Sequence, residues 1–236
     1  MTLRLGVNTS KIDWIAAEES LTTRGFATLP GVLSTQECED LIALYSNPDL
    51  FRSRIDMARF RFGRGEYQYF CYPLPPLVDN LRNELYSRLA PIANSWAASL
   101  DTDDFPPTLE GLTTFCHRRG QQRPTPLLLH YKTGDYNCLH QDVYGEVAFP
   151  LQVVFFLSEP DRDYSGGEFL LTEQIPRAQT MGRALRPRQG DAVVITTRYR
   201  PAKGKRGTYR VGVRHGVSEV TAGERWTLGI IFHDAA

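Results

Sequence analysis

The sequence lacks the features that would tie it to a membrane, a secretory route or a disulfide framework. No apolar run reaches the roughly 18 residues of a spanning helix. Residues 1–20 lack the apolar segment of a secretory signal. We therefore expect a cytoplasmic protein with no membrane partner. No two cysteines form a CxxC pair, which favours free thiols in a reducing compartment and argues against zinc at Cys38, Cys71, Cys116 and Cys138.

Net charge of either sign is also missing, although the charge is unevenly distributed. The chain has 27 basic and 27 acidic residues. Residues 177–210 contain ten Lys or Arg and one acid, a local charge of +9, so the remainder carries 17 basic and 26 acidic residues, or −9. Such a segment predicts a local anionic partner or, equally, a solvated loop with long hairpin arms.

The composition that is present suits one soluble globular domain spanning residues 1–236. Hydrophobic residues make up 42% and charged residues 23%. Residues 1–110 are predicted to be mostly helical support. Ser34 and Glu37 have the spacing of a capping box. Apolar residues recur at helical intervals after Pro76, and Pro91 is expected to bend or split that helix.

The hydrophobic period changes near residue 110, and residues 111–236 are predicted to form a β core. Short apolar or alternating runs bounded by Gly and Pro favour an all-β sandwich or barrel over a parallel α/β sheet. The expected architecture is therefore a β-barrel or jelly roll buttressed by N-terminal helices. The predicted strands are "TPLLLHYKTG", "VAFPLQVVFFLSEP", "GGEFLLTE", "GDAVVITTR", "YRVGVRHGVSEV" and "RWTLGIIFHDA".

A metal site is predicted from His140, Asp142 and His215. In extended backbone, residues two apart point the same way, so His140 and Asp142 can grip one ion. A His-x-Asp pair also occurs by chance, and a structural histidine is its ordinary alternative. His215, in a late predicted strand, completes the two-histidine, one-carboxylate set of non-haem iron(II) oxygenases. His117, His130 and His233 have no carboxylate at ligand spacing and are interpreted as structural.

Arg225 and Thr227 are predicted to bind a carboxylate near that metal. A hairpin over 217–226 would return both residues beside His215. The guanidinium fork, with a hydroxyl, matches a carboxylate bidentately.

These residues together resemble the signature of iron(II)/2-oxoglutarate-dependent dioxygenases, in particular the prolyl-hydroxylase-like branch. Longer stretches, from "RFGRGEYQYFCYPLPPLVDNLRNELY" to "RHGVSEVTAGERWTLGIIFHDA", are similar to a bacterial subgroup often described as nucleic-acid-acting oxygenases. The resemblance implies a double-stranded β-helix that binds Fe²⁺, 2-oxoglutarate and O₂, with ascorbate as reductant. It also implies that Tyr131 reaches the 2-oxoglutarate carboxylate, where the alternative is a packing tyrosine, and that the glycines of "SGGEF" form a turn.

The activity implied is hydroxylation of a substrate C–H group, which on an N-methyl group leads to demethylation. Alkylation-repair enzymes carry a second Arg six residues after the first, but this chain has Ile231 there, which favours the prolyl-hydroxylase pattern. The substrate stays open between a small molecule, a peptide and a nucleic acid, and the basic segment favours an anionic one. The arginine-rich segment 51–72 is either a base-stacking platform or a packed loop. The alternative function is a non-catalytic metal- or nucleic-acid-binding β-barrel module.

Overall fold

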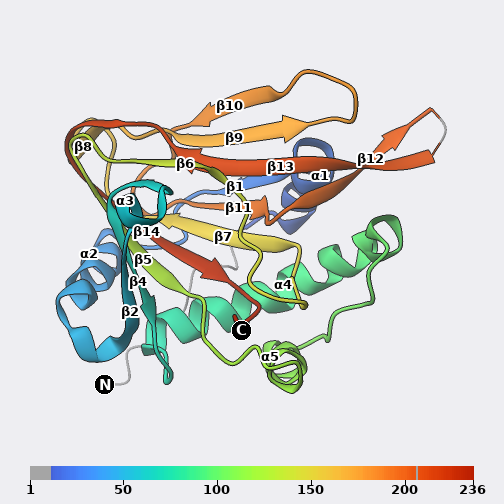
Figure 1. Cartoon of the computed structure of the whole chain (residues 1–236), viewed down its shortest axis with the longest axis horizontal. Coiled ribbons are helices and arrows are strands. Elements are labelled where there is room, and N and C mark those ends of the chain that lie inside the picture. The colour runs from blue at the N-terminus through green and yellow to red at the C-terminus, as the bar shows by residue number, and fades with distance from the viewer. Residues whose placement is uncertain (1–11, 206) are drawn as a thin grey trace.

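The computed structural model describes residues 12–205 and 207–236. Residues 1–11, within the segment expected to lack a secretory signal, and Arg206 of the basic segment lie outside the described residues. In the described part, two antiparallel sheets stack on each other and the long helix α4 runs beneath them (Figure 1). The prediction of a mainly β protein with helices towards the N-terminus is confirmed.

The larger sheet has the strand order β1-β11-β7-β14-β5-β4-β2, and β8 pairs with β14. All of the strands predicted from apolar runs are present, four of them in this sheet. Its members are β1 (Phe26–Leu29), β2 (Phe51–Asp56), β4 (Glu66–Phe70), β5 (Leu127–Lys132), β7 (Leu151–Phe156), β8 (Tyr164–Gly166), β11 (Ala192–Thr196) and β14 (Val220–Ile231).

The smaller sheet has the order β10-β9-β13-β6-β3, and β12 pairs with β13. Most of the basic segment 177–210 lies here and in β11, where it forms strands and their connections. Part of the positive charge of this segment is neutralised inside the protein, because buried Arg200 pairs with Glu173 at 2.6 Å. The members are β3 (Gly63–Arg64), β6 (Tyr136–His140), β9 (Phe169–Gln174), β10 (Met181–Leu185), β12 (Tyr199–Gly204) and β13 (Gly207–Val217).

The helices begin largely where the sequence predicts. Ser34 and Glu37 form the expected capping box. Pro91 does not split the helix after Pro75, which stays continuous. No helix in the described ranges is long and apolar enough to cross a membrane. The helices are α1 (Trp14–Arg24), α2 (Thr35–Ala43), α3 (Met57–Phe60), α4 (Pro76–Leu100) and α5 (Leu109–Arg118), with 3₁₀ turns η2 (Leu44–Ser46) and η3 (Pro48–Leu50).

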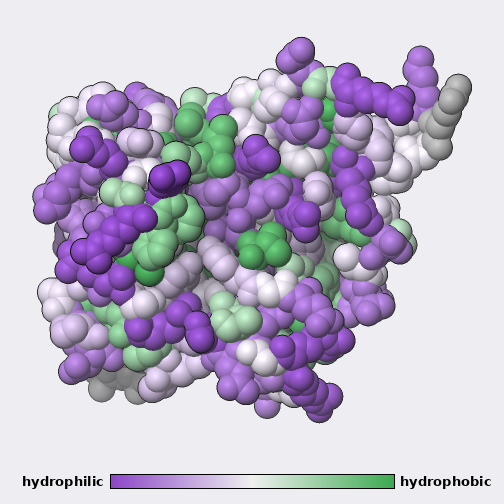
Figure 2. Space-filling model, viewed as in Figure 1, coloured by the Kyte–Doolittle hydropathy of each residue, from purple (hydrophilic) through white to green (hydrophobic). Residues whose placement is uncertain are grey.

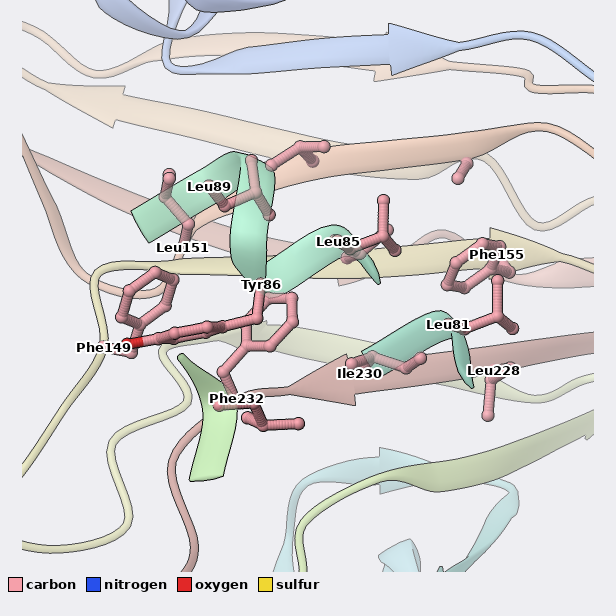
Figure 3. Close-up of a cluster of buried hydrophobic side chains, with 14 of the residues drawn as sticks. Leu81, Leu85, Tyr86, Leu89, Phe149, Leu151, Phe155, Leu228, Ile230 and Phe232 are labelled. Carbon is pink, nitrogen blue, oxygen red and sulfur yellow. The ribbon is translucent and has the colours of Figure 1, made fainter. Parts of the chain in front are cut away.

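The main core lies between α4 and one face of the larger sheet. Figure 3 shows Leu81, Leu85 and Tyr86 of α4 packed towards side chains from β7, β14 and the segments beside them. Successive residues of a strand face opposite sides, so Leu228 and Ile230 enter this core. Arg225 and Thr227 therefore point to the other side, between the sheets.

Two local expectations were wrong. Segment 51–72 is not a loop: it forms β2, α3, β3 and β4, and β2 and β3 are edge strands of the two sheets. Residues 217–226 do not form a hairpin. β13 pairs with β6, β9 and β12, whereas β14 pairs with β5, β7 and β8. The chain crosses from one sheet to the other there.

Candidate active site

His140, Asp142 and His215 meet between the sheets because of the register of β6 and β13. Those strands are antiparallel, and His140 lies directly opposite His215. Asp142 follows two residues after the end of β6. Its Oδ2 lies 3.2 Å from His215 Nε2, and its Oδ1 lies 3.6 Å from His140 Nε2. One ligand atom from each residue lies within 4.8 Å of the others.

The environment of the triad suits a divalent metal. The Cys138 carbonyl lies 2.8 Å from His140 Nδ1 and can only accept a hydrogen bond, which leaves Nε2 with its lone pair directed at the site. Burial, followed by the charge of His215, lowers the pKa of His140. Burial opposes the charge of Asp142, but the adjacent His215 and His140 outweigh burial and hold the pKa of that carboxyl well below its usual range. Two imidazoles and a carboxylate fit Fe²⁺.

Gln141, between His140 and Asp142, anchors the segment that carries these two candidate ligands. Its Nε2 donates to the carbonyls of Val213 at 2.8 Å and Arg198 at 3.1 Å. These bonds tie the chain after β6 to β13 and to the start of β12. The ligand segment is therefore held although residues 141–148 form no regular strand.

Arg225 and Thr227 lie on the wall of the same cavity, on β14. Arg225 is directly opposite Tyr131 of β5 in the register. The guanidinium is 1% exposed, and none of its three nitrogens has a hydrogen-bond partner among the described residues. It is surrounded instead by the rings of Tyr131, Phe156 and Tyr164, whose centroids lie 5.4–5.9 Å from its central carbon.

The groups beside Arg225 are arranged to leave room for an acceptor. Tyr131 is fully buried, and its hydroxyl accepts a hydrogen bond from Asn137 Nδ2 at 3.3 Å. Burial raises the pKa of Tyr131 to about 12, so the phenol keeps its proton. The "SGGEF" glycines lie at the end of β8 and in its connection to β9, with φ of 69° at Gly166 and 62° at Gly167. A Cβ on Gly167 would lie 3.0 Å from Arg225 Cδ.

A phenol contact to the triad escaped the sequence analysis. Tyr144 Oη donates to Asp142 Oδ1 at 2.6 Å, and Tyr69 Oη donates to Tyr144 Oη at 3.2 Å. The signal available in the sequence was the spacing of Tyr144, two residues after a candidate ligand. Tyr69 is remote in sequence and is brought in by the pairing of β4 with β5.

The cavity between the sheets encloses about 340 Å³ and contains the triad, Arg225 and Thr227 in one space. That volume lies within the usual range for small-molecule sites. The larger sheet contributes the aromatic residues Tyr67, Tyr69 and Tyr131 to its lining. Arg225, Thr227 and the candidate metal-binding triad thus share one partly apolar chamber.

The remaining histidines take part in other contacts. His117 Nε2 lies 3.0 Å from Asp234, and His130 stacks on Trp226 with its Nε2 2.9 Å from Glu224. His117 belongs to α5 and not to a loop. In the described ranges, only the triad brings three metal-ligating side chains together.

Comparison with known proteins identifies the class. The fold is that of solved 2-oxoglutarate- and Fe(II)-dependent oxygenases. Residues 65–235 match the profile of a family described as "Oxygenase, catalysing oxidative methylation of damaged DNA", and the chain belongs to that family. An uncharacterized protein of Mycobacterium tuberculosis strain H37Rv is 50% identical over 168 residues, which cover 71% of this chain and 72% of that protein.

Solved structures bear out the jelly-roll core. A prolyl-4-hydroxylase from Pseudomonas putida matches with a TM-score of 0.56 at 17% identity, covering 94% of this chain and 99% of that chain. HygX from Streptomyces hygroscopicus, solved with nickel and 2-oxoglutarate bound, matches with a TM-score of 0.50 at 15% identity, covering 91% and 85% of the two chains. The prediction of a prolyl-hydroxylase-like oxygenase fold is confirmed.

Proposed function

We propose that this protein uses Fe²⁺, 2-oxoglutarate and O₂ to hydroxylate a C–H group of its substrate. His140, Asp142 and His215 would hold the iron, which when bound supplies the activation of O₂. One oxygen atom enters succinate as 2-oxoglutarate loses CO₂, and the other enters the substrate as a hydroxyl group. On an N-methyl group, the hydroxymethyl product releases formaldehyde and leaves the demethylated nitrogen.

The observation that carries the proposal is the buried, unpartnered Arg225 in the cavity of the triad. A buried cation is costly unless an anion and hydrogen-bond acceptors compensate it. No carboxylate among the described residues does so. The distal carboxylate of 2-oxoglutarate would supply the charge and the acceptors, with the Thr227 hydroxyl beside it and the protonated Tyr131 phenol opposite. The chain's own groups would thereby orient the cosubstrate towards the metal ligands.

The alternative of a non-catalytic metal- or nucleic-acid-binding barrel does not explain this arrangement. A binding barrel has no need of an uncompensated guanidinium, which costs stability in the ligand-free protein. The carboxylate anchor and the open three-ligand site are both required only if a keto acid and a metal react in the same space.

The test removes one metal ligand at a time. Asp142→Ala and His215→Ala should each abolish succinate formation from 2-oxoglutarate, assayed with Fe²⁺ and ascorbate. Both variants should stay folded, because apolar packing against α4 and not the metal holds the sheets together. Anaerobic iron titration supplies the second measurement. Wild-type iron affinity in both variants would show that the triad does not bind the metal.

The mouth of the cavity favours single-stranded nucleic acid as substrate. Phe60 and Phe62 are exposed by 53% and 48% and stack on each other, with ring centroids 5.6 Å apart. Phe62 lines the cavity and lies beside β6, because its carbonyl accepts a hydrogen bond from the Cys138 amide. Apolar patches alternate with hydrophilic ones on the face that carries α3 and β6 (Figures 1 and 2).

Cations surround this aromatic mouth. Arg59, Arg61 and Arg64 are exposed beside the phenylalanines. The basic segment 177–210 reaches the mouth at Arg198, whose carbonyl accepts from Gln141. Aromatic faces with flanking arginines bind unpaired bases through stacking and backbone charge. The family description, which names damaged DNA, supports the same substrate class.

Fluorescence anisotropy with single- and double-stranded oligonucleotides at two salt concentrations tests the substrate class. The single strand should bind more tightly, and its affinity should fall steeply with salt. Replacing Phe60 and Phe62 together with Ala should weaken it by roughly tenfold or more, since stacking on one base is worth about 1–3 kcal/mol. Ile15→Ala, at an exposed apolar residue of α1, is the control. Absence of binding at low salt would favour a peptide or small-molecule substrate.

A further inference from the structure

The hydroxyl of Tyr144 makes the shortest side-chain contact to the candidate metal ligands. It donates to Oδ1 of Asp142 at 2.6 Å, whereas Oδ2 faces His215 Nε2 at 3.2 Å. The two carboxylate oxygens therefore have different surroundings. Oδ1 accepts the phenol's hydrogen bond and lies 3.6 Å from His140 Nε2, whereas Oδ2 lies closer to an imidazole and has no phenol.

A directional chain of groups holds the Tyr144 hydroxyl in this orientation. Tyr69 Oη donates to Tyr144 Oη at 3.2 Å, so Tyr144 accepts one hydrogen bond and has its own proton for Asp142. Arg52 lies over the Tyr69 ring, with its central carbon 4.4 Å from the ring centroid. Arg52 is fixed in turn by the bond from its Nε to the Pro124 carbonyl at 2.9 Å. Successive bonds of this kind polarise and strengthen one another.

The backbone of Tyr144 is also held in place. Its carbonyl accepts a hydrogen bond from the Ala236 amide at 3.2 Å, at the end of the segment that follows β14. The ring lies edge-on to that of Tyr69, with centroids 6.3 Å apart. Tyr144 is thus positioned from β4 and from the C-terminal segment, independently of the ligand-bearing strands β6 and β13.

We propose that Tyr144 is a positioning residue for the metal-ligating carboxylate. By occupying Oδ1, its hydroxyl restricts Asp142 to coordination through Oδ2 and fixes the carboxylate plane relative to the histidines. The phenol also draws charge from the carboxylate and so moderates its donation to the metal. Partners of this kind orient ligands and commonly change metal affinity or activity by 10–100-fold. This inference rests on the proposed role of Asp142 as a metal ligand.

The test compares Tyr144→Phe with the wild type by anaerobic Mn²⁺ titration and by the visible absorption spectrum of the Co²⁺-loaded protein. Losing the hydroxyl should raise the Mn²⁺ dissociation constant by about 10–100-fold. It should also change the Co²⁺ bands, because both oxygens of Asp142 then become available to the metal. A merely structural tyrosine would leave that spectrum unaltered.

Tyr86→Phe is the matched control, since the Tyr86 hydroxyl also makes a 2.6 Å hydrogen bond, to the Pro106 carbonyl, and Tyr86 does not line the cavity. Its Mn²⁺ affinity and Co²⁺ spectrum should equal those of the wild type. Should Tyr144→Phe unfold, Tyr69→Phe removes only the supporting donor and should give a smaller loss of affinity in the same direction. If the folded Tyr144→Phe protein keeps the wild-type Mn²⁺ affinity and Co²⁺ spectrum, the role of Tyr144 is overturned while the proposed function stands. The same result in Tyr69→Phe decides the question where Tyr144→Phe does not fold. Failure of the wild type to bind metal would overturn it together with the proposed function.

Discussion

Replacing Arg225 separates cosubstrate binding from metal binding. Arg225→Gln keeps some hydrogen bonding but removes the charge and the two-pronged fork. Hydrogen bonds to charged groups are worth roughly 1.5–3 kcal/mol, so the dissociation constant of 2-oxoglutarate should rise by about ten- to a hundredfold. Arg225→Lys should be tolerated better, because it restores the charge without the fork. The metal dissociation constant should change little in either variant.

The same residue should also influence stability in the opposite sense to an ordinary buried arginine. Arg225 has no hydrogen-bond partner in the part of the chain that the structure describes, whereas Arg200, also buried, is paired with Glu173 at 2.6 Å. Arg225→Met should therefore stabilise the ligand-free protein, and Arg200→Met should destabilise it by leaving Glu173 unpaired. In the wild type, 2-oxoglutarate at a hundred times its dissociation constant should add about 2.7 kcal/mol of stability. That gain should be lost in Arg225→Met.

The assay is 2-oxoglutarate titration by anaerobic calorimetry with Mn²⁺ in place of iron, followed by urea unfolding with and without the cosubstrate. An unchanged 2-oxoglutarate constant in Arg225→Gln would mean that another residue holds the carboxylate, with Tyr131 or an arginine of 177–210 next in line. A collapse of metal affinity with the cosubstrate constant unaltered would refute the placement of β14 beside the metal.

Two further predictions concern stability away from the metal. His233 is fully buried and its Nδ1 accepts from the Phe149 amide, and burial lowers its pKa to about 4. In the unfolded state this histidine has an ordinary pKa near 6.5, so the unfolded state binds more protons than the folded state below that pH. The free energy of unfolding should therefore fall as the pH drops from about 6.5 towards 4, by about 2 kcal/mol at pH 5. Urea unfolding at several pH values should show this slope, and His233→Asn should reduce it. Asp234→Asn should cost about 3–5 kcal/mol in urea unfolding, because it breaks a fully buried pair with Arg82 at 2.7 Å; a near-neutral result would contradict that role for the pair.

The strands that the sequence predicts are those with an uninterrupted apolar face. β7 and β11 are buried along their whole length and appear as continuous Val, Ile, Leu and Phe runs. The missed strands are exposed on one or both sides. β2 and β6 have half-exposed or exposed residues throughout, so neither shows an apolar alternation. The hydrophobic pattern therefore did not predict the strand that contains His140, although the His-x-Asp spacing predicted His140 as a metal ligand.

The residues of the candidate site could be predicted from the sequence, but the contacts between them could not. His140, Asp142 and His215 share a known ligand pattern, but their meeting depends on a pairing between β6 and β13 across 75 residues of chain. The sequence predicted a hairpin that would bring Arg225 beside His215, and that hairpin does not form. Arg225 lies near the candidate ligands because its sheet stacks on the sheet that contains His140 and His215. The Tyr69–Tyr144–Asp142 contacts depend on side-chain geometry between remote segments, for which the sequence has no local signal.

The pattern of β14 shows why the core and the site cannot be separated. Leu228 and Ile230 face α4, while Arg225, Thr227 and Gly229 face the cavity. A slip of one residue in the pairing with β5 or β7 would place the guanidinium against α4 and the leucine in the cavity. The cost of burying that charge in an apolar layer excludes the slipped register. The alternation that folds the sheet onto α4 therefore also directs the proposed carboxylate anchor towards the metal ligands.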